Sequence, residues 1–218
     1  GIGLVMWRVR AKSGGMTARD GFLIVGLSWI AMSLFGALLF VLTGDIPNYI
    51  DALFETISGL TTTGASVVTA PEEMTRGGMF WRLFTHWIGG MGILVFVLAV
   101  LPMSGNRSMH IMRAEVPGPT VGKLVPRIRK TASILYLLYI ALTLVEMVLL
   151  IAGGMSFYDA LLHAFATAGT GGLSTRALSI GYYNSAYIDI VVGVFMILFG
   201  VNFSLYYLIP VSYTHLTL

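Results

Sequence analysis

Two short runs rich in threonine and glycine are the residues of this chain best suited to bind a ligand. The first is Thr61-Thr62-Thr63-Gly64, and a related run, Gly169-Thr170-Gly171-Gly172, ends 108 residues later. Glycine adopts positive φ without steric cost, so the carbonyls on either side of it can point the same way. Threonine hydroxyls add further acceptors. A row of backbone carbonyls can replace the water shell of a dehydrated cation, and we therefore predict that the backbone oxygens of both runs bind an ion.

The donor set favours a monovalent cation. Neither run contains histidine, cysteine or a carboxylate, whereas a tight divalent site would use carboxylates. His86 and His163 have no cysteine and no third ligand at a recognisable spacing, so we expect no resident metal. We also expect no covalently bound cofactor. Taken singly, each run is also compatible with a packing contact of small residues between helices.

The composition is that of a polytopic membrane protein. Hydrophobic residues make up 56% of the chain and charged residues 11%, with a mean hydropathy of +0.84, and a soluble domain of this size rarely has such values. The absence of cysteine excludes disulfides. The formal net charge is +3, but the basic residues cluster at the ends of apolar segments and not on one face. We therefore expect no nucleic-acid partner.

Four apolar segments are long enough to cross a bilayer. They are residues 21–42, 79–101, 131–151 and 187–209, each roughly 30 Å or more as helix. A segment of about 13 residues, 48–60, lies between the first and second of these, and another, 156–168, lies between the third and fourth. Each is too short to span a bilayer. Each short segment opens with a capping pattern, Asn48 with Asp51 and Ser156 with Asp159. Both are predicted to be half-helices that enter the membrane and stop at a Thr/Gly run.

The two halves of the chain are a repeat. At an offset of 108, identical residues occupy positions 51 and 159, 52 and 160, 53 and 161, 62 and 170, 64 and 172, and 66 and 174. The predicted fold class is an all-α integral membrane protein with two tandem helix–re-entrant half-helix–loop–helix repeats, at 21–101 and 131–209. A basic segment, 1–20, precedes them, and a basic linker, 102–130, lies between them.

The basic residues predict the orientation. Ten of the 13 lysines and arginines lie in 1–20 or 102–130, which the positive-inside rule makes cytoplasmic together with the N-terminus. The half-helices then enter from outside, and each points the partial negative charge of its C-terminus at the middle of the membrane, where a cation is favoured.

Several charged residues stand apart from the loops. Asp51 and Glu55 lie on one face of the first half-helix and could form an acidic outer vestibule that concentrates cations, although a cap plus a solvated face is the alternative. Arg82 is expected to pair with Glu72 or Glu73, or to snorkel. Glu146, near the outer end of its segment, is expected to be a hydrated or paired anchor.

The ends of the chain look unnatural. It begins at Gly1, and residues 211–218, with Pro210, are similar to the translation of a sequencing-library adapter. We expect 210–218 to be an artefact and the chain to be a fragment.

The motifs resemble the TrkH/KtrB/HKT superfamily of potassium transporters, most closely its TrkH branch. The resemblance covers nearly all of residues 1–209 and rests on runs that follow the family's order: Asp51-Ala52-Leu53-Phe54-Glu55, Thr61-Thr62-Thr63-Gly64-Ala65, Phe80-Trp81-Arg82, Trp87-Ile88-Gly89-Gly90-Met91-Gly92-Ile93, Arg113-Ala114-Glu115-Val116-Pro117-Gly118-Pro119, Ala166-Thr167 and Gly171-Gly172-Leu173-Ser174-Thr175.

The resemblance implies four repeats around one pore, each giving one loop to a selectivity filter, with the first two repeats present here. Gly64 and Gly172 match the family's pattern for K⁺ preference, whereas Ala168-Gly169-Thr170 departs from the branch's usual residues. It further implies K⁺ uptake across a bacterial inner membrane, a homodimer of the full-length protein, and a ring of cytosolic nucleotide-binding, TrkA-like regulatory subunits near the linker.

Two other functions are compatible with parts of the sequence. An intramembrane hydrolase would use a serine or threonine with His163 as its base, but the equivalent position in the first repeat is Glu55. A helical scaffold without transport is the other alternative. We predict that the chain is not an enzyme.

Overall fold

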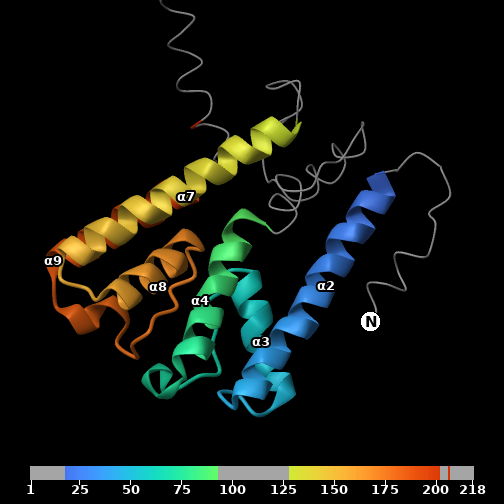
Figure 1. The fold of residues 1–218 in the computed structure, drawn as a ribbon, viewed down its shortest axis with the longest axis horizontal. Helices are drawn as coiled ribbons and strands as arrows, with labels where there is room; N and C mark the ends of the chain where they lie inside the picture. The colour runs from blue at the N-terminus through green and yellow to red at the C-terminus, as the bar shows by residue number, and fades with distance from the viewer. Residues whose placement is uncertain (1–17, 93–127, 202–205, 207–218) are drawn as a thin grey trace, which may run out of the picture.

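The computed structural model describes residues 18–92, 128–201 and 206, and every regular element in these ranges is helical (Figure 1). The first half contains α2 (Ala18–Thr43), α3 (Tyr49–Leu60), the 3₁₀ helix η1 (Pro71–Glu73) and α4 (Arg76–Met91). The second contains α7 (Ile128–Ala152), α8 (Phe157–Ala168), the 3₁₀ helix η3 (Ser179–Tyr183) and α9 (Ala186–Gly200).

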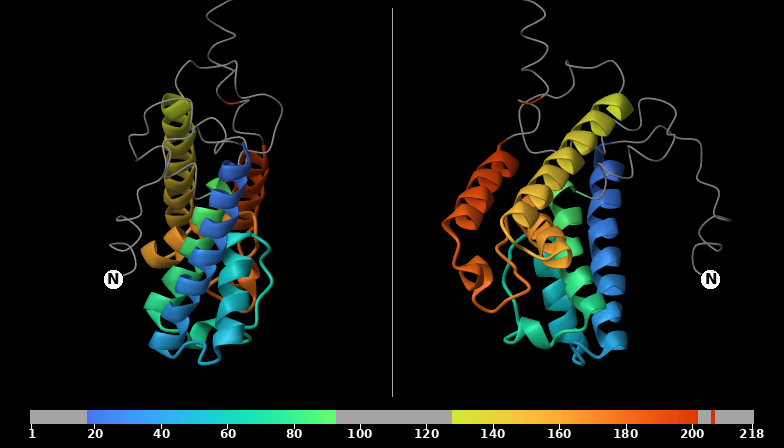
Figure 2. Two further views of the ribbon diagram at one scale, coloured as in Figure 1. Left: turned by 90° about the vertical axis from the view of Figure 1, so that its right-hand side faces the viewer. Right: turned by 60° about the vertical axis from the view of Figure 1, so that its left-hand side comes forward.

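The helices form two groups with the same arrangement. The short helix α3 packs against both α2 and α4, and α8 packs against both α7 and α9. The two groups meet where α4 packs against α8, as the views in Figures 1 and 2 show. Each half of the chain therefore places a short helix between two longer ones.

Two of the predicted spans are helices long and apolar enough to cross a membrane by length and composition. These stretches are Leu23–Thr43, with a mean hydropathy of 2.2, and Ser133–Ala152, with 2.5. The helix α9 is apolar but shorter, at 15 residues, and α4 has 16. Residues 93–101 of the second predicted span, and all but one of residues 202–209 of the fourth, lie outside the described residues. So do most of the basic N-terminal segment, most of the linker and the predicted artefact at 210–218.

Both short helices begin at the predicted caps. The Asn48 side chain accepts from the backbone N–H of Ile50 at 2.9 Å, and Ser156 Oγ accepts from the N–H of Asp159 at 3.1 Å. Each cap satisfies a donor that the first helical turn leaves without a partner. The capping pattern thus predicted the start of α3 and α8 to the residue.

Glycines let the ends of both short helices reach α4. A Cβ added at Gly89 would collide with the backbone oxygen of Leu60, the last residue of α3. One added at Gly90 would lie 2.9 Å from the backbone oxygen of Ala168, the last residue of α8. The α4 helix therefore supports the C-terminal ends of both short helices through backbone contact that a side chain would prevent.

Candidate functional site

The two predicted binding runs form matching loops. We call residues 61–66, after α3, the first loop, and residues 169–174, after α8, the second loop. Thr61 donates its N–H to Ile57 at 2.8 Å, and Gly169 donates to Phe165 at 3.3 Å. The next residue of each loop also donates to equivalent acceptors: Thr62 to Gly59 at 3.0 Å, and Thr170 to Thr167 at 2.8 Å. The offset of 108 therefore holds for backbone hydrogen bonds as well as for residue types.

The backbone conformation of the loops also repeats. Gly64 and Gly172 have φ of 77° and 79°, and the threonines two residues earlier, Thr62 and Thr170, have φ of 56° and 53°. Positive φ is uncommon outside glycine, so two threonines that share it at equivalent positions define one loop conformation. Sequence reasoning anticipated the glycines and missed the threonines, since threonine has no general preference for this region.

The loops contact each other directly. A Cβ added at Gly64 would overlap the backbone oxygen of Gly171 in the second loop. The two backbones are therefore closer there than any residue except glycine permits. The structure thus brings together the predicted residues of the two runs, Thr61 to Gly64 and Gly169 to Gly172, at one place between α4 and the ends of α3 and α8.

A side chain of each short helix supports the loop that follows it. Ser66 Oγ donates to Glu55, lying 3.0 Å from Oε1, and the N–H of Val67 donates to Oε2 at 3.0 Å. In the second repeat, His163 Nε2 lies 2.9 Å from Ser174 Oγ, and its Nδ1 lies 2.7 Å from the backbone oxygen of Asp159. Nδ1 must donate to that carbonyl, so a neutral His163 accepts from Ser174.

Arg82 forms an ion pair that differs from the one predicted. Its Nε lies 2.6 Å from Glu55 Oε1, and both side chains are buried. Glu72 and Glu73 are exposed instead. The pairing corrects the expectation for Glu55 too, because only 1% of that residue is exposed. Of the predicted acidic vestibule, only the partly exposed Asp51 keeps a place compatible with it.

Glu72 connects the segment between α3 and α4 to the segment between α8 and α9. The N–H of Ala177 donates to Glu72 Oε1 at 2.7 Å. This hydrogen bond, aided by the positive charge of Arg176, lowers the pKa of Glu72 below its usual 4.5. A second connection runs from the hydroxyl of Tyr158, which donates to the backbone oxygen of Arg76 at 2.6 Å.

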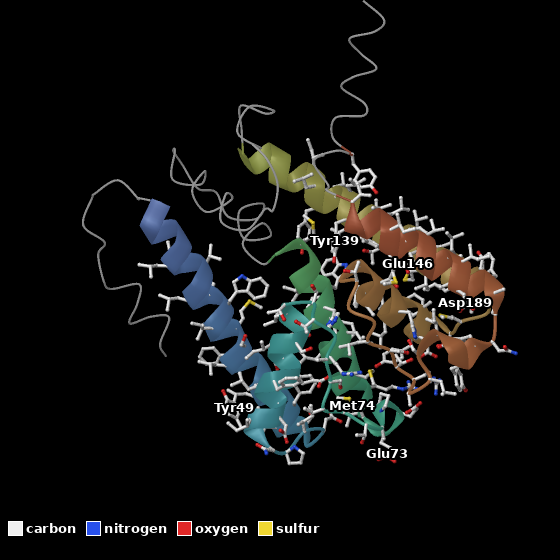
Figure 3. All side chains as sticks on the ribbon, turned by 180° about the vertical axis from the view of Figure 1, so that it is seen from behind. Tyr49, Glu73, Met74, Tyr139, Glu146 and Asp189 are labelled. Carbon is white, nitrogen blue, oxygen red and sulfur yellow. The ribbon has the colours of Figure 1, made fainter. Side chains whose placement is uncertain are left out.

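Glu146 is buried, which its predicted place near the end of an apolar segment did not indicate. It lies in the part of the molecule formed by α7, α8 and α9, far from Glu73 and Met74, which come just before α4 (Figure 3). It is completely buried and lies beside Thr167 of α8, and among the described residues it forms no ion pair. Its position in the sequence indicated depth along the helix but not which side of α7 it occupies.

His86 is buried behind the loops. A Cβ added at Gly171 would overlap its Nε2, and one at Gly59 would lie 3.6 Å from its Nδ1. Its ring thus packs against the backbone of both repeats. Among residues 18–92 and 128–201, no group of three or more His, Asp or Glu side chains is placed to hold a metal ion.

Comparison with known proteins identifies the family. Residues 3–216 match the family model TrkH, described as a cation transport protein. The chain belongs to the TrkH family. The Trk system potassium uptake protein TrkH of Escherichia coli K12 is 40% identical over 207 residues, which are 94% of this chain and 43% of that protein. The TrkH of Halomonas elongata is 42% identical over 194 residues, 88% of this chain and 40% of that protein.

A solved structure agrees with this assignment. The crystal structure of the potassium transporter TrkH from Vibrio parahaemolyticus superposes with a TM-score of 0.74 at 36% identity, covering 94% of this chain and 41% of that one. The chain therefore spans less than half the length of these TrkH relatives. The all-helical fold and the membrane character of the prediction are confirmed by this match and by the family.

The family also decides the enzyme question. TrkH proteins are transport proteins and not enzymes, as predicted. The Ser174–His163 pair has the geometry of a nucleophile and its base, but it has another explanation. Glu55 makes the same contact to Ser66 with a side chain that is not a histidine, so both pairs serve to hold a loop.

Proposed function

We propose that this chain supplies two loops of the selectivity filter of a Trk-type potassium uptake protein. The observation that carries the proposal is the agreement of the first and second loops in backbone hydrogen bonds, in positive φ at two positions, and in their mutual contact at Gly64 and Gly171. Backbone oxygens of residues 61–64 and 169–172 would bind the dehydrated ion. K⁺ is then the transported ion, and the potassium uptake named for the relatives supports this.

The short helices suit this role as re-entrant half-helices. Both have 12 residues, which is roughly 18 Å of helix and too short to cross the hydrocarbon core. Each ends where its loop begins, so the partial negative charge of its C-terminus lies beside the proposed ion. Non-helical backbone at that depth is tolerated where it lines water or is buried in protein.

The filter would need more loops than these two. Gly64 of the first loop packs on Gly171 of the second; we expect Gly172 to pack in the same way on a third loop. Four repeats around one axis would close such a ring, consistent with the greater length of the relatives. In that arrangement the N-terminus is cytoplasmic in a bacterial inner membrane, the complete protein is a homodimer, and TrkA-like nucleotide-binding subunits contact its cytoplasmic side.

The test uses a chimera in which residues 3–209 replace the matching part of Escherichia coli TrkH. It is expressed in a host that lacks K⁺ uptake systems, and uptake of K⁺ and Na⁺ is measured. Gly64→Ser and Gly172→Ser are expected to lower the ratio of K⁺ to Na⁺ uptake. Gly44→Ser is the matched control, because Gly44 also has positive φ, 78°, but lies between α2 and α3.

The outcomes separate the candidate functions. An unchanged ratio in both loop variants, in a chimera that does carry K⁺, would contradict the filter. A chimera that is inserted and folded but carries no K⁺ would favour the non-transporting scaffold. Loss of discrimination in the Gly44 variant as well would show that the effect is general strain and not specific to the loops.

A further inference from the structure

Resting on the proposed filter, we propose that Arg82 is a positioning residue that fixes the first and second loops relative to each other and thereby sets ion discrimination. Its three guanidinium nitrogens contact three different groups. Nε pairs with Glu55 at 2.6 Å, Nη2 donates to Ser66 Oγ at 2.8 Å, and Nη1 donates to the backbone oxygen of Ser174 at 3.2 Å. One side chain thus contacts the first short helix, the first loop and the second loop.

The contact to the second loop is made through its backbone. Ser174 follows Gly172 by two residues, and Leu173 between them is buried, so a shift of the Ser174 carbonyl is passed to the proposed ion-binding oxygens along a short length of chain. Ser174 is itself held at its hydroxyl by His163. Hydrogen bonds thus link Glu55 through Ser66 and Arg82 to the backbone oxygen of Ser174, and the hydroxyl of the same serine links it to His163.

Four of the five members of the network are buried. Arg82 is 4% exposed, Glu55 1%, His163 2% and Ser174 7%, whereas Ser66 is exposed. Hydrogen bonds shielded from water are stronger electrostatically, and breaking one leaves a polar group without a partner. A planar guanidinium can donate hydrogen bonds in three fixed directions at once, whereas a lysine ammonium is a compact charge at the end of a flexible chain. The geometry therefore specifies arginine and not only a positive charge.

Arg82 has no counterpart in the second repeat. The residue at the same offset in α9 is Ile190, which is 66% exposed. His163, at the place of Glu55, can be neutral and needs no cation beside it. The Arg82 contacts therefore support the filter only where the first and second loops meet. The selection of K⁺ over Na⁺ by the whole filter depends on this support.

The experiment uses the same chimera with Arg82→Lys. This variant keeps a positive charge beside Glu55 but loses the planar guanidinium that makes the three contacts. The matched control is Arg176→Lys, because Arg176 also pairs with a carboxylate, Asp159 at 3.5 Å, and lies two residues after Ser174, but its side chain is 32% exposed. Folded, membrane-inserted protein and its melting temperature are measured alongside the ratio of K⁺ to Na⁺ uptake. We expect Arg82→Lys to lower that ratio by about tenfold, equivalent to about 1.4 kcal/mol of lost discrimination, and Arg176→Lys to leave it unchanged.

A purely structural role predicts a lower melting temperature with the uptake ratio intact, and that result overturns the proposal. If Gly64→Ser or Gly172→Ser changes the ratio and Arg82→Lys does not, the filter stands and the positioning role fails. If none of the three variants changes it, the filter itself fails. Should Arg82→Lys not accumulate, the double variant Glu55→Gln with Arg82→Gln, which leaves no unpaired charge, takes its place. If that variant also fails to fold, Arg82 serves stability alone and the proposal is wrong.

Discussion

Glu55 and His163 occupy equivalent positions in the two short helices, and each contacts the serine 11 residues further along the chain. Both loops are thus held by a contact between a short helix and a serine at the same spacing, but the helix residue is a carboxylate in one repeat and an imidazole in the other. The buried carboxylate of Glu55 is paired with the cation of Arg82, whereas a neutral imidazole needs no counter-charge. The two loops are therefore held by unequal means, and the first depends on a charge pair.

This inequality predicts different costs for the same kind of change. Glu55→Gln leaves Arg82 buried without its counter-charge and is expected to cost about 3–5 kcal/mol of unfolding free energy. His163→Gln removes a neutral hydrogen bond and should cost about 1 kcal/mol. Thermal unfolding of the purified chimera in detergent, with both variants side by side, measures the difference. Equal losses would mean that the pair contributes no more than an ordinary hydrogen bond.

Gly64 is expected to tolerate alanine less well than a glycine that has the same φ but no neighbour. An L-residue in the left-handed region costs roughly 1–2 kcal/mol, and Gly64→Ala and Gly44→Ala share this cost because their φ values are 77° and 78°. Only Gly64→Ala adds an overlap with the Gly171 backbone oxygen, while around Gly44 the structure describes no atom within 4 Å of the added carbon. K⁺ uptake and melting temperature should both fall further for Gly64→Ala. In a closed ring, Gly172→Ala should resemble Gly64→Ala, and a mild effect there would contradict the third loop.

The α4 glycines give a prediction about the support of the short helices. Gly89→Ala introduces a carbon against the Leu60 backbone oxygen, which cannot move without moving the end of α3. A cost of about 1–3 kcal/mol is expected from such overpacking. Gly193→Ala in α9 has no described atom within 4 Å, so it should instead stabilise by about 0.5–1 kcal/mol through the backbone entropy of the unfolded chain. A melting temperature that rises for both would show that α3 yields without cost.

Local patterns in the sequence predicted the local structure well. The capping residues Asn48 and Ser156 fixed the starts of α3 and α8, and the repeat offset placed both loops, because these features depend on neighbours along the chain. The partner of Arg82 could not be predicted in this way. Glu72 and Glu73 are nearer to it in the sequence than Glu55, but pairing is decided by how α3 and α4 pack.

The same limit explains two other differences. Hydropathy indicated how deep Glu146 lies along α7. It did not indicate that Glu146 is on the side of α7 that faces α8, so its burial was not predicted. The contact of Arg82 with Ser174 joins residues 92 positions apart. It follows from the meeting of the two repeats, for which a single sequence carries no local signal.

The Glu72–Ala177 connection predicts a pH-dependent change in the segments that follow the two loops. Because the hydrogen bond from Ala177 lowers the pKa of Glu72 below 4.5, the interaction stabilises the folded state above pH 4.5 and is lost as the pH falls through the lower, folded-state pKa. The amide chemical shift of Ala177, followed by NMR on protein labelled with ¹⁵N-alanine, should therefore titrate with a midpoint below pH 4.5. Glu72→Gln is the control, since its amide oxygen still accepts from Ala177 but does not titrate, and its shift should stay flat. A midpoint at or above 4.5 in the unsubstituted protein would mean that Ala177 does not favour the ionised carboxylate, and that the two halves of the chain are held together here by Tyr158 and Arg76 instead.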